Sequence, residues 1–258
     1  MLPQSHSSRR KPAKPRGFFS LFARAPAPEE THRIYAVGDI HGRADLLDKL
    51  LEKIVRDASQ TPATQSLVFV GDYIDRGSDS RGVIERLLDP PEGFETHYLR
   101  GNHDQALLDF LENPSSYRTW RRFGADETLL SYDVEPPAQD ETAVALARDE
   151  LAEKLPASHL RFLQDLQPFV QIGAYHFVHA GVRPGLSLED QSLEDMMWIR
   201  DEFLNCEDDF GKIVVHGHTP GERPICRSNR IGIDTGAFAT NCLTAVVLDG
   251  VGARFLNT

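Results

Sequence analysis

The sequence LVFVGDYIDRG, from Leu67 to Gly77, predicts a buried strand that runs into a polar loop. Its first four residues form a continuous apolar run, which is typical of a strand covered on both faces. Gly71 then lets the backbone turn sharply, and Asp72 and Asp75 follow where the apolar run ends. Open α/β sheets bind their ligands at this end of a strand. Taken alone, the loop could also be a turn with solvated charges.

Four other segments repeat this pattern of an apolar run followed by glycine and polar residues. They are GDIHG after residues 34–37, RGNHD after residues 97–99, HAG after residues 175–178 and HGHT after residues 213–215. Together with the first loop, they supply six oxygen or imidazole donors and no thiolate: Asp39, His41, Asp72, Asn102, His179 and His218. Such a set suits manganese, iron, zinc or magnesium, and it argues against an iron–sulfur cluster or a cysteine zinc site.

In this order, GDIHG, GDYIDRG, RGNHD, HAG and HGHT resemble the signature blocks of the calcineurin-like metallophosphoesterases. The resemblance is to the phosphoprotein phosphatase branch, which includes bacterial serine/threonine protein phosphatases. The blocks extend from Gly38 to Thr219, which is most of the chain. The resemblance implies a four-layer α/β/β/α sandwich and a phosphoester hydrolase with two divalent metal ions. Manganese is the favoured metal, with iron and zinc as alternatives.

The resemblance also implies a role for each metal ligand. It assigns Asp39 and His41 to the first metal, and it assigns a separate set to the second metal: Asn102, His179 and His218. Two ions close together need a shared ligand, and we expect Asp72 to be that bridge. A water activated by both metals would then attack phosphorus in line. Of the two histidines in HGHT, the family pattern selects His218, whereas His216 would support the loop.

Further motif residues are expected to handle the proton and the phosphate. His103 would protonate the leaving alkoxide, and the resemblance makes Asp104 its anionic partner, which would raise the pKa of the imidazole. Asp104 could instead, or in addition, cap a helix. Arg76, Arg100 and Arg200 would bind the non-bridging phosphate oxygens through paired donors. Arg200 lies in WIRDEF, a block that bacterial relatives share, although an arginine in such a context is often a surface residue.

The order of elements along the chain predicts the architecture. Three strand, loop and helix units, beginning near residues 34, 67 and 97, favour a largely parallel sheet with right-handed crossovers. An amphipathic helical pattern from about residue 113 to 168 predicts an insertion. Within it, residues 120–131 resemble a tract that bacterial relatives carry near the metal site, so Arg121 or Arg122 could reach substrate. The strands expected after residue 168 would form the second sheet: 169–172, 175–178, 213–215, 231–233, 244–248 and 253–256.

Residues 1–33 differ in composition from the predicted metallophosphoesterase domain, residues 34–258. They hold seven Lys or Arg residues, two Glu residues and five Pro residues, which predicts a disordered basic tail. The apolar run Phe18–Phe22 is too short for a secretory signal core. The whole chain carries a net charge of -11, which argues against a nucleic-acid substrate bound by broad charge.

The cysteines and the hydropathy suggest where the protein works. The three cysteines, Cys206, Cys226 and Cys242, show no CxxC spacing, and no apolar run is long enough to span a membrane. We therefore expect reduced thiols in a cytoplasmic protein with no stable membrane insertion.

Three functions remain open from the sequence. The favoured one is a serine/threonine protein phosphatase acting on a phosphoprotein or phosphopeptide, with phosphotyrosine as a further candidate. A symmetrical diadenosine tetraphosphate hydrolase resembles this chain in the same motifs. A metal-binding scaffold without catalysis is disfavoured, because the ligands, the acid pair and the arginines are all present.

Overall fold

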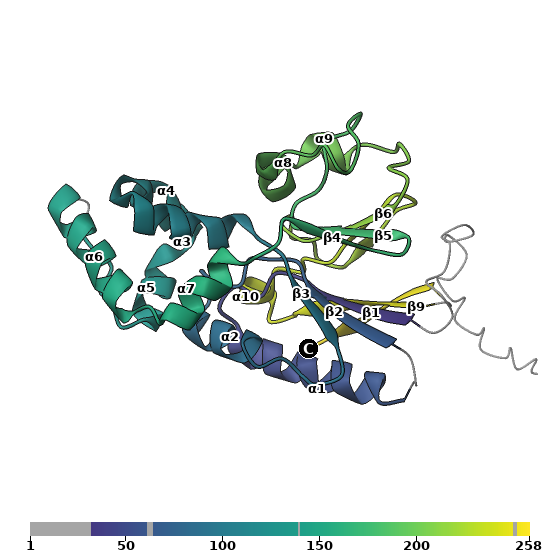
Figure 1. Cartoon of the computed structure of the whole chain (residues 1–258), viewed down its shortest axis with the longest axis horizontal. Helices are drawn as coiled ribbons and strands as arrows, with labels where there is room; N and C mark the ends of the chain where they lie inside the picture. The colour runs from purple at the N-terminus through teal and green to yellow at the C-terminus, as the bar shows by residue number, and fades with distance from the viewer. Residues whose placement is uncertain (1–31, 61–63, 139, 250–251) are drawn as a thin grey trace, which may run out of the picture.

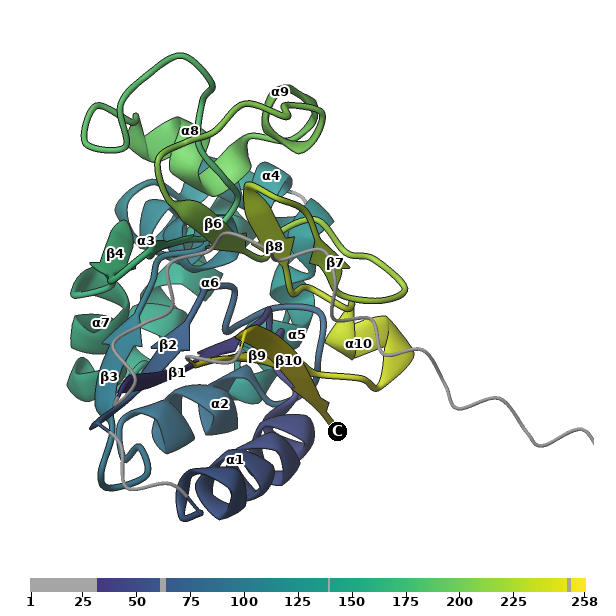
Figure 2. The same ribbon diagram turned by 90° about the vertical axis from the view of Figure 1, so that its right-hand side faces the viewer.

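The computed structural model describes residues 32–60, 64–138, 140–249 and 252–258. Two five-stranded sheets pack face to face, and helices cover the outer face of each one (Figures 1 and 2). This arrangement confirms the predicted four-layer α/β/β/α sandwich. Most of the predicted basic tail, residues 1–31, lies outside the described residues.

The first sheet has the strand order β10-β9-β1-β2-β3. Its three parallel strands are β1 (His32–Val37), β2 (Thr64–Phe69) and β3 (Glu95–Tyr98). Each is followed by a helix, in the order α1 (Ala44–Ala58), α2 (Ser80–Leu87) and α3 (Asn102–Glu112). The three predicted strand, loop and helix units are therefore confirmed.

The last two strands belong to the first sheet, and their predicted place in the second sheet is wrong. Strand β9 (Thr244–Asp249) pairs antiparallel with β1, and β10 (Gly252–Asn257) pairs antiparallel with β9. The apolar part of β1 is completely buried, so the backbone groups on its side away from β2 need a strand partner. An apolar run shows that a strand is buried, but not which sheet it joins.

The second sheet has the strand order β4-β5-β6-β8-β7. Its strands are β4 (Phe169–Ile172), β5 (Tyr175–Val178), β6 (Ile213–His216), β7 (Ile225–Cys226) and β8 (Arg230–Gly232). Two short helices, α8 (Leu193–Trp198) and α9 (Asp201–Leu204), cover its outer face (Figure 1). Because β5, β6 and β8 run parallel, their carboxyl ends point toward the same edge of the sandwich.

Alternating side chains place a separate apolar cluster on each face of the first sheet. Ile34 and Val68 point between the sheets and pack with Phe177 and Val215 of the second sheet. The opposite face of the same strands, with Tyr35 and its neighbours, packs against the helices. Both clusters contain large, fully buried side chains, which make the sandwich a rigid support for the loops at its edge.

The helices between α3 and β4 extend the helical layer of the first sheet (Figure 1). They are η1 (Pro114–Ser116), α4 (Tyr117–Trp120), η2 (Arg121–Phe123), α5 (Ala125–Ser131), α6 (Glu141–Lys154) and α7 (Ala157–Gln164). Their buried residues, including Trp120, Leu151 and Leu163, join the core that lies under α1–α3. A further short helix, α10 (Ala237–Thr240), precedes β9. Among the helices in the described ranges, none combines the length and the hydropathy needed to cross a bilayer.

Candidate active site

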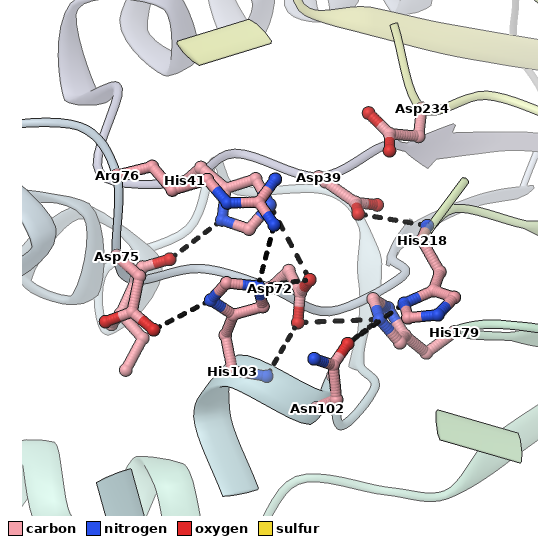
Figure 3. A network of polar contacts seen from close by, with 12 residues as sticks. Asp39, His41, Asp72, Asp75, Arg76, Asn102, His103, His179, His218 and Asp234 are labelled. Atoms are coloured by element: carbon pink, nitrogen blue, oxygen red, sulfur yellow. Dashed lines mark hydrogen bonds and ion pairs between the residues drawn. The ribbon is translucent and has the colours of Figure 1, made fainter. Parts of the chain in front are cut away.

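Loops from both sheets converge on Asp72, which lies at the centre of a network of polar side chains (Figure 3). Five residues of this network adopt backbone φ angles of 48° to 71°, in the left-handed region: His41, Asp72, Asp75, Arg76 and His218. This conformation costs a residue other than glycine about 1 to 3 kcal/mol. Such a concentration of strain at one place indicates a functional site.

The Asp72 carboxylate belongs to two groups of potential metal ligands. One group contains His41 and His103, and the other contains His179 and His218; the ligand atoms of each group lie within 4.8 Å of one another. The Oδ2 atom of Asp72 lies 3.6 Å from His41 Nε2, whereas its Oδ1 atom lies 3.4 Å from His179 Nε2. Each carboxylate oxygen therefore faces a different imidazole, as a ligand shared by two ions requires.

Two imidazoles of the site, those of His41 and His179, present lone pairs toward Asp72. His41 Nδ1 bonds the carbonyl oxygen of Ile74, and His179 Nδ1 bonds that of Val70, both at 2.9 Å. Because a carbonyl oxygen only accepts, each Nδ1 carries the proton and each Nε2 carries the lone pair. Burial lowers the pKa of His41 to about 3 and that of His218 to about 2, and it also lowers the pKa of His179. These rings are therefore neutral near neutral pH.

Several oxygen and nitrogen lone pairs in the site have no hydrogen-bond donor beside them. The Asn102 Oδ1 atom lies 3.0 Å from His179 Nε2 and 2.9 Å from His218 Nδ1, although Nε2 of His179 carries no hydrogen. Two buried atoms, Asp39 Oδ1 and His218 Nε2, have no hydrogen-bond partner within the described residues. A Cβ atom on Gly217 would collide with Asp39 Oδ1, so only glycine fits there. Buried lone pairs that accept no hydrogen bond can be satisfied by cations. These oxygen and imidazole ligands fit two divalent ions.

His103 is paired with Asp75, a residue of the GDYIDRG loop. Its Nδ1 atom lies 2.7 Å from Asp75 Oδ2, and Asp75 also accepts bonds from Trp120 Nε1 at 2.9 Å and Thr128 Oγ1 at 2.6 Å. Burial opposes the charged imidazole, but the carboxylates of Asp72 and Asp75 outweigh it and raise the pKa of His103. A fixed, fully buried carboxylate therefore orients the His103 ring and favours its charged form.

Asp104, which the sequence analysis paired with His103, instead binds backbone groups. Its carboxylate accepts N–H bonds from Gly101 and Asp72 at 2.9 Å and from Tyr73 at 3.1 Å. His103 and Asp104 are adjacent in α3, and neighbouring side chains on a helix point in different directions. The assignment of Asp104 as the imidazole partner is therefore corrected, and its position is that of the helix cap also considered.

Two of the three predicted phosphate-binding arginines lie beside the polar network. Arg76 Nη2 is 3.2 Å from His103 Nε2, and its guanidinium lies 4.7 Å from the centre of the Phe238 ring. Arg200 is exposed and donates to Thr219 Oγ1 at 3.3 Å. Burial and the neighbouring imidazole of His179 are the larger causes of the low pKa of His218, and the Arg200 charge lowers it further.

The third arginine, Arg100, lies on the other side of its loop. It donates to Gln105 Oε1 at 3.0 Å and to the carbonyl oxygen of Gln164 at 2.7 Å, so it links α3 to α7. The predicted phosphate contact is therefore corrected, because these two acceptors hold the guanidinium against the helical layer.

The tract 120–131 reaches the site, but not through the two arginines suggested by the sequence. Arg121 pairs with Asp126 at 3.0 Å, and Arg122 is exposed on η2. The residues that do reach the site are Trp120 and Thr128, which bind Asp75, and Phe123, whose ring centre is 5.3 Å from that of His103.

His216 and His218 lie on different sides of their loop. The ring of His216 packs against Phe203 at 5.0 Å, away from Asp72, whereas the backbone N–H of His218 donates to Asp39 Oδ2 at 3.0 Å. The structure thus places His218 in the polar network and His216 in the support behind it.

Asp234 is a site residue that the sequence analysis did not single out. It is 5% exposed, and burial raises the pKa of its carboxyl to about 6. Burial raises the pKa of Asp39 as well, with a further contribution from the charge of Asp234. A signal was present, because Asp234 follows the apolar residues Ile231 and Ile233 and precedes Gly236, like the other donors.

Comparison with known proteins identifies the class of protein that this fold and site define. Residues 32–241 match the family described as calcineurin-like phosphoesterase, and the chain belongs to that family. It is similar to serine/threonine-protein phosphatase 1 of Salmonella typhimurium, with 29% identity over 87% of this chain and 95% of the relative. It is also similar to an asymmetrical bis(5'-nucleosyl)-tetraphosphatase of a Geobacillus species, with 26% identity over 83% and 89%.

Solved structures support the same fold. A crystal structure described as a putative diadenosine tetraphosphatase aligns with a TM-score of 0.60 at 22% identity, over 89% of this chain and 95% of that chain. A cold-active protein tyrosine phosphatase of a Shewanella species aligns with a TM-score of 0.53 at 16% identity, over 92% and 85%. At these identities the comparison shows the fold alone. The chain is therefore a phosphatase of the metallophosphoesterase class, and its substrate is a separate question.

Proposed function

We propose that this protein is a two-metal phosphoprotein phosphatase that acts on phosphoserine and phosphothreonine, with manganese as the metal. One observation carries the proposal. His103, which is hydrogen-bonded to the Asp75 carboxylate, lies beside a buried cluster of potential metal ligands centred on Asp72. The imidazole of His103 and the two carboxylate oxygens of Asp72 are within reach of one small ligand, since His103 Nε2 is 3.7 Å from Asp72 Oδ2. An acid next to paired metals fits hydrolysis of a phosphomonoester.

The metal ligands in this proposal come from both sheets. Asp39 and His41 would hold one ion, and the other ion would be held by three residues: Asn102, His179 and His218. Asp72 would bind both, because its two oxygens face opposite imidazoles. When bound, two such ions supply Lewis acidity to the phosphate and lower the pKa of a water molecule enough to make it nucleophilic near neutral pH. The donors contain only oxygen and imidazole nitrogen, which suits manganese.

His103 would donate a proton to the leaving oxygen. Its Nδ1 atom bonds Asp75, so the proton would leave from Nε2, which lies 3.7 Å from Asp72 Oδ2. In the structure Arg76 Nη2 donates to this Nε2, and a bound phosphate would take over that donor and leave Nε2 free to carry the proton. Asp75 keeps the ring oriented, and its charge favours the imidazolium form. The buried bonds from Trp120 and Thr128 keep Asp75 itself in place.

Two arginines would bind the phosphate. Arg76 reaches the site from the first sheet and Arg200 from the second, so they approach a shared ligand from two elements. Two guanidinium groups and two divalent ions suffice for one phosphate dianion. Of the other arginines considered from the sequence, Arg100 faces the helical layer and Arg121 is paired with Asp126, so within the described part of the chain neither adds charge at this point.

The choice between substrates rests on the positive charge beside the site, which comes from Arg76 and Arg200. A phosphorylated side chain brings one dianion on a mostly neutral backbone, whereas a dinucleoside polyphosphate carries further phosphates that need cationic partners. The similarity to the Salmonella enzyme named serine/threonine-protein phosphatase 1 supports the phosphoprotein. The three cysteines are free thiols, which supports the cytoplasmic setting that we also propose.

Hydrolysis of dinucleoside polyphosphates is the second candidate function. It is supported by the similarity to relatives named bis(5'-nucleosyl)-tetraphosphatase, which are named asymmetrical, whereas the sequence analysis considered the symmetrical reaction. The two candidates share the metal ligands and the acid. They differ in what must bind beyond the reacting phosphate.

A comparison of specificity constants tests the proposal. The kcat/KM values for a varied panel of phosphoserine and phosphothreonine peptides are measured beside that for diadenosine tetraphosphate, with one manganese concentration and one pH. We expect the better peptides to exceed the dinucleotide. If diadenosine tetraphosphate is turned over at least about tenfold better than every peptide, the second candidate function replaces the first.

A further inference from the structure

The outer face of the second sheet carries a buried arginine that the proposed reaction does not use. Arg230 is the first residue of β8 and is 5% exposed. Its Nη2 atom donates to the carbonyl oxygen of Leu204, the last residue of α9, at 2.7 Å. Its Nε and Nη1 atoms are buried and have no hydrogen-bond partner within the described residues. Two of its guanidinium nitrogens are therefore unsatisfied, although buried polar groups are normally hydrogen-bonded.

A second arginine faces Arg230 across the hairpin that joins β7 to β8 (Figure 2). The backbone N–H of Arg227 donates to the carbonyl oxygen of Arg230 at 2.8 Å, and only two residues of the chain separate them. Side chains that lie directly opposite each other on paired strands project from the same face, and like charges in such a pair are destabilising. The hairpin therefore brings two positive charges to one place, one exposed and one buried.

No carboxylate forms an ion pair with either arginine in the part of the chain that the structure describes. Burial lowers the pKa of Arg230, and the charge of Arg227 lowers it further. Arg33 shows the contrast, because Asp57 and Asp249 lie 3.2 and 3.3 Å from its guanidinium nitrogens. A buried charge is normally paired, so the arginines of the hairpin leave a place for an anion.

Both arginines line a cleft with a volume of about 520 Å³ between the hairpin and the segment after α9. Small-molecule sites have volumes of about 300 to 1,000 Å³. The cleft is held by a buried side chain, since Asn229 Nδ2 donates to the carbonyl oxygens of Cys206 and Asp208, both at 2.9 Å. The exposed Glu207 also lines the cleft, but it pairs with neither arginine within the described residues.

We propose that this cleft is a second anion-binding site, which takes the phosphate group of a small molecule between the guanidinium groups of Arg227 and Arg230. A phosphate dianion supplies the two negative charges that the arginine pair lacks, and its oxygens accept hydrogen bonds from planar guanidinium donors. A single carboxylate supplies only one charge. The volume of the cleft leaves room for an organic group attached to the phosphate.

The cleft is separate from the polar network around Asp72. The Arg230 guanidinium lies 5.9 Å from the centre of the Phe203 ring on α9. Phe203 is completely buried and packs against His216, which lies behind the loop that carries His218. None of the residues that line the cleft belongs to the network shown in Figure 3. Phosphate bound in the cleft would therefore leave the active site open to substrate.

Counting bound phosphate tests the proposal. Equilibrium dialysis of the metal-loaded enzyme with radiolabelled inorganic phosphate, at constant ionic strength, should give one phosphate more per chain for the wild type than for Arg230→Met. Arg227→Gln keeps the buried arginine and should bind that phosphate about tenfold more weakly. Arg118→Met is the matched control, because Arg118 is an exposed arginine on α4. Its phosphate count should equal that of the wild type, and an equal count in Arg230→Met would overturn the proposal.

Inhibition by phosphate separates the cleft from the active site. With a small aryl phosphate as substrate, the inhibition constant of phosphate reports binding at the active site. That constant and kcat/KM should agree within about twofold between the wild type, Arg230→Met and Arg227→Gln. If the inhibition constant rises in both variants while the phosphate count stays the same, the two arginines support the active site and the proposal is wrong.

Thermal unfolding shows whether Arg230→Met fails for a structural reason. Replacing a buried, unpaired charge by an apolar side chain should not lower the Tm in phosphate-free buffer. Phosphate should raise the Tm of the wild type more than that of the variant, because a ligand stabilises the folded state that binds it. A lower Tm of the variant without phosphate, together with equal increases on adding phosphate, would make Arg230 a structural residue and overturn the site.

Phenylphosphonate, which has no phosphoester bond to hydrolyse, distinguishes the free ion from a phosphate group on an organic molecule. Its binding is compared with that of inorganic phosphate in the wild type and in Arg230→Met. If the cleft takes an organic phosphate, the phosphonate should bind there at least as tightly as phosphate does. Weaker binding identifies the free ion as the ligand. If neither compound distinguishes the wild type from the variant, the cleft binds no phosphate group and the proposal fails.

Discussion

The two sheets contribute unequal halves to the active site. The loops of the first sheet supply residues that are buried and strained: His41, Asp72, Asp75 and Arg76 all have positive φ angles. The second sheet supplies the buried His179 and His218, of which only the latter has a positive φ angle. Its side of the site also carries exposed residues from α8 and the loop after it, Trp198 and Arg200.

This difference suggests that the two halves have different roles, one in positioning the catalytic groups and the other in selecting the substrate. Strained backbone persists only where the surrounding structure determines it, so the first half is suited to fix the metals and the acid at set positions. Exposed side chains can move to meet a ligand, so the outer part of the second half is suited to select the substrate. Substitutions in the first half should therefore reduce kcat on all substrates, and those at the exposed positions should change KM and substrate preference.

Loss of the shared ligand should have the largest effect. In Asp72→Ala, both proposed metal positions lose a ligand, and His103 loses a nearby negative charge. We expect kcat on a phosphoserine peptide to fall by about three orders of magnitude or more. Circular dichroism serves as the fold control. A folded variant that keeps a tenth of the activity would contradict the central place of Asp72.

The second-largest effect is expected at His103, and its size should depend on the leaving group of the substrate. His103→Asn removes the proposed proton donor, which we expect to cost about a hundredfold or more in kcat on an alkyl ester such as phosphoserine. Phosphates of acidic phenols leave readily without a proton and should lose much less. The ratio of the two losses is the measurement. Equal losses would make His103 a positioning residue.

Substitutions of Asp75 and Asp104 should have different effects, the first on the pH dependence of activity and the second on stability. The carboxylates of Asp72 and Asp75 raise the pKa of His103, and activity that needs its proton is lost as the pH rises through that pKa. Asp75→Asn removes part of the cause, so the alkaline limb of kcat/KM should move down by about one pH unit or more.

Asp104→Ala provides the contrast to that variant. It leaves three buried backbone N–H groups without their acceptor, which should lower the free energy of unfolding by roughly 3 kcal/mol. The alkaline limb should stay where it is. A shift of the limb in Asp104→Ala but not in Asp75→Asn would restore the pairing suggested by the sequence.

The smallest effect is expected at the exposed Arg200. Arg200→Lys keeps the charge but loses the planar pair of donors, so KM should rise about fivefold with kcat nearly unchanged. Steady-state kinetics on one phosphopeptide separate the two constants. A drop in kcat that equals the rise in KM would show that Arg200 acts like the buried residues of the first sheet, and not as a substrate-selecting residue.

Residues at strand ends were the most predictable part of the site. The sequence identified Asp39, His41, Asp72, Asn102 and His218 because an apolar run, a glycine and a donor are all local features. The structure brings these residues together around Asp72. Asp234 carries the same local signal, since it follows the apolar residues Ile231 and Ile233 and precedes Gly236.

Features that depend on contacts distant in sequence were not predictable. The partner of His103 lies 28 positions earlier in the chain, and its own supports, Trp120 and Thr128, come from the helices after α3. Arg100 turns toward Gln164, which is 64 positions away. The placing of β9 beside β1 depends in the same way on strand pairing rather than on the composition of β9. Local patterns specify donors, whereas tertiary packing decides where each side chain points.

Counting the bound metal tests the central claim most directly. After reconstitution with manganese and removal of excess ion, elemental analysis should give two ions per wild-type chain. Asp39→Ala should retain about one, and Asp72→Ala should retain fewer than either, because Asp72 faces both imidazole groups. One ion per wild-type chain at saturation, together with full activity, would contradict the account.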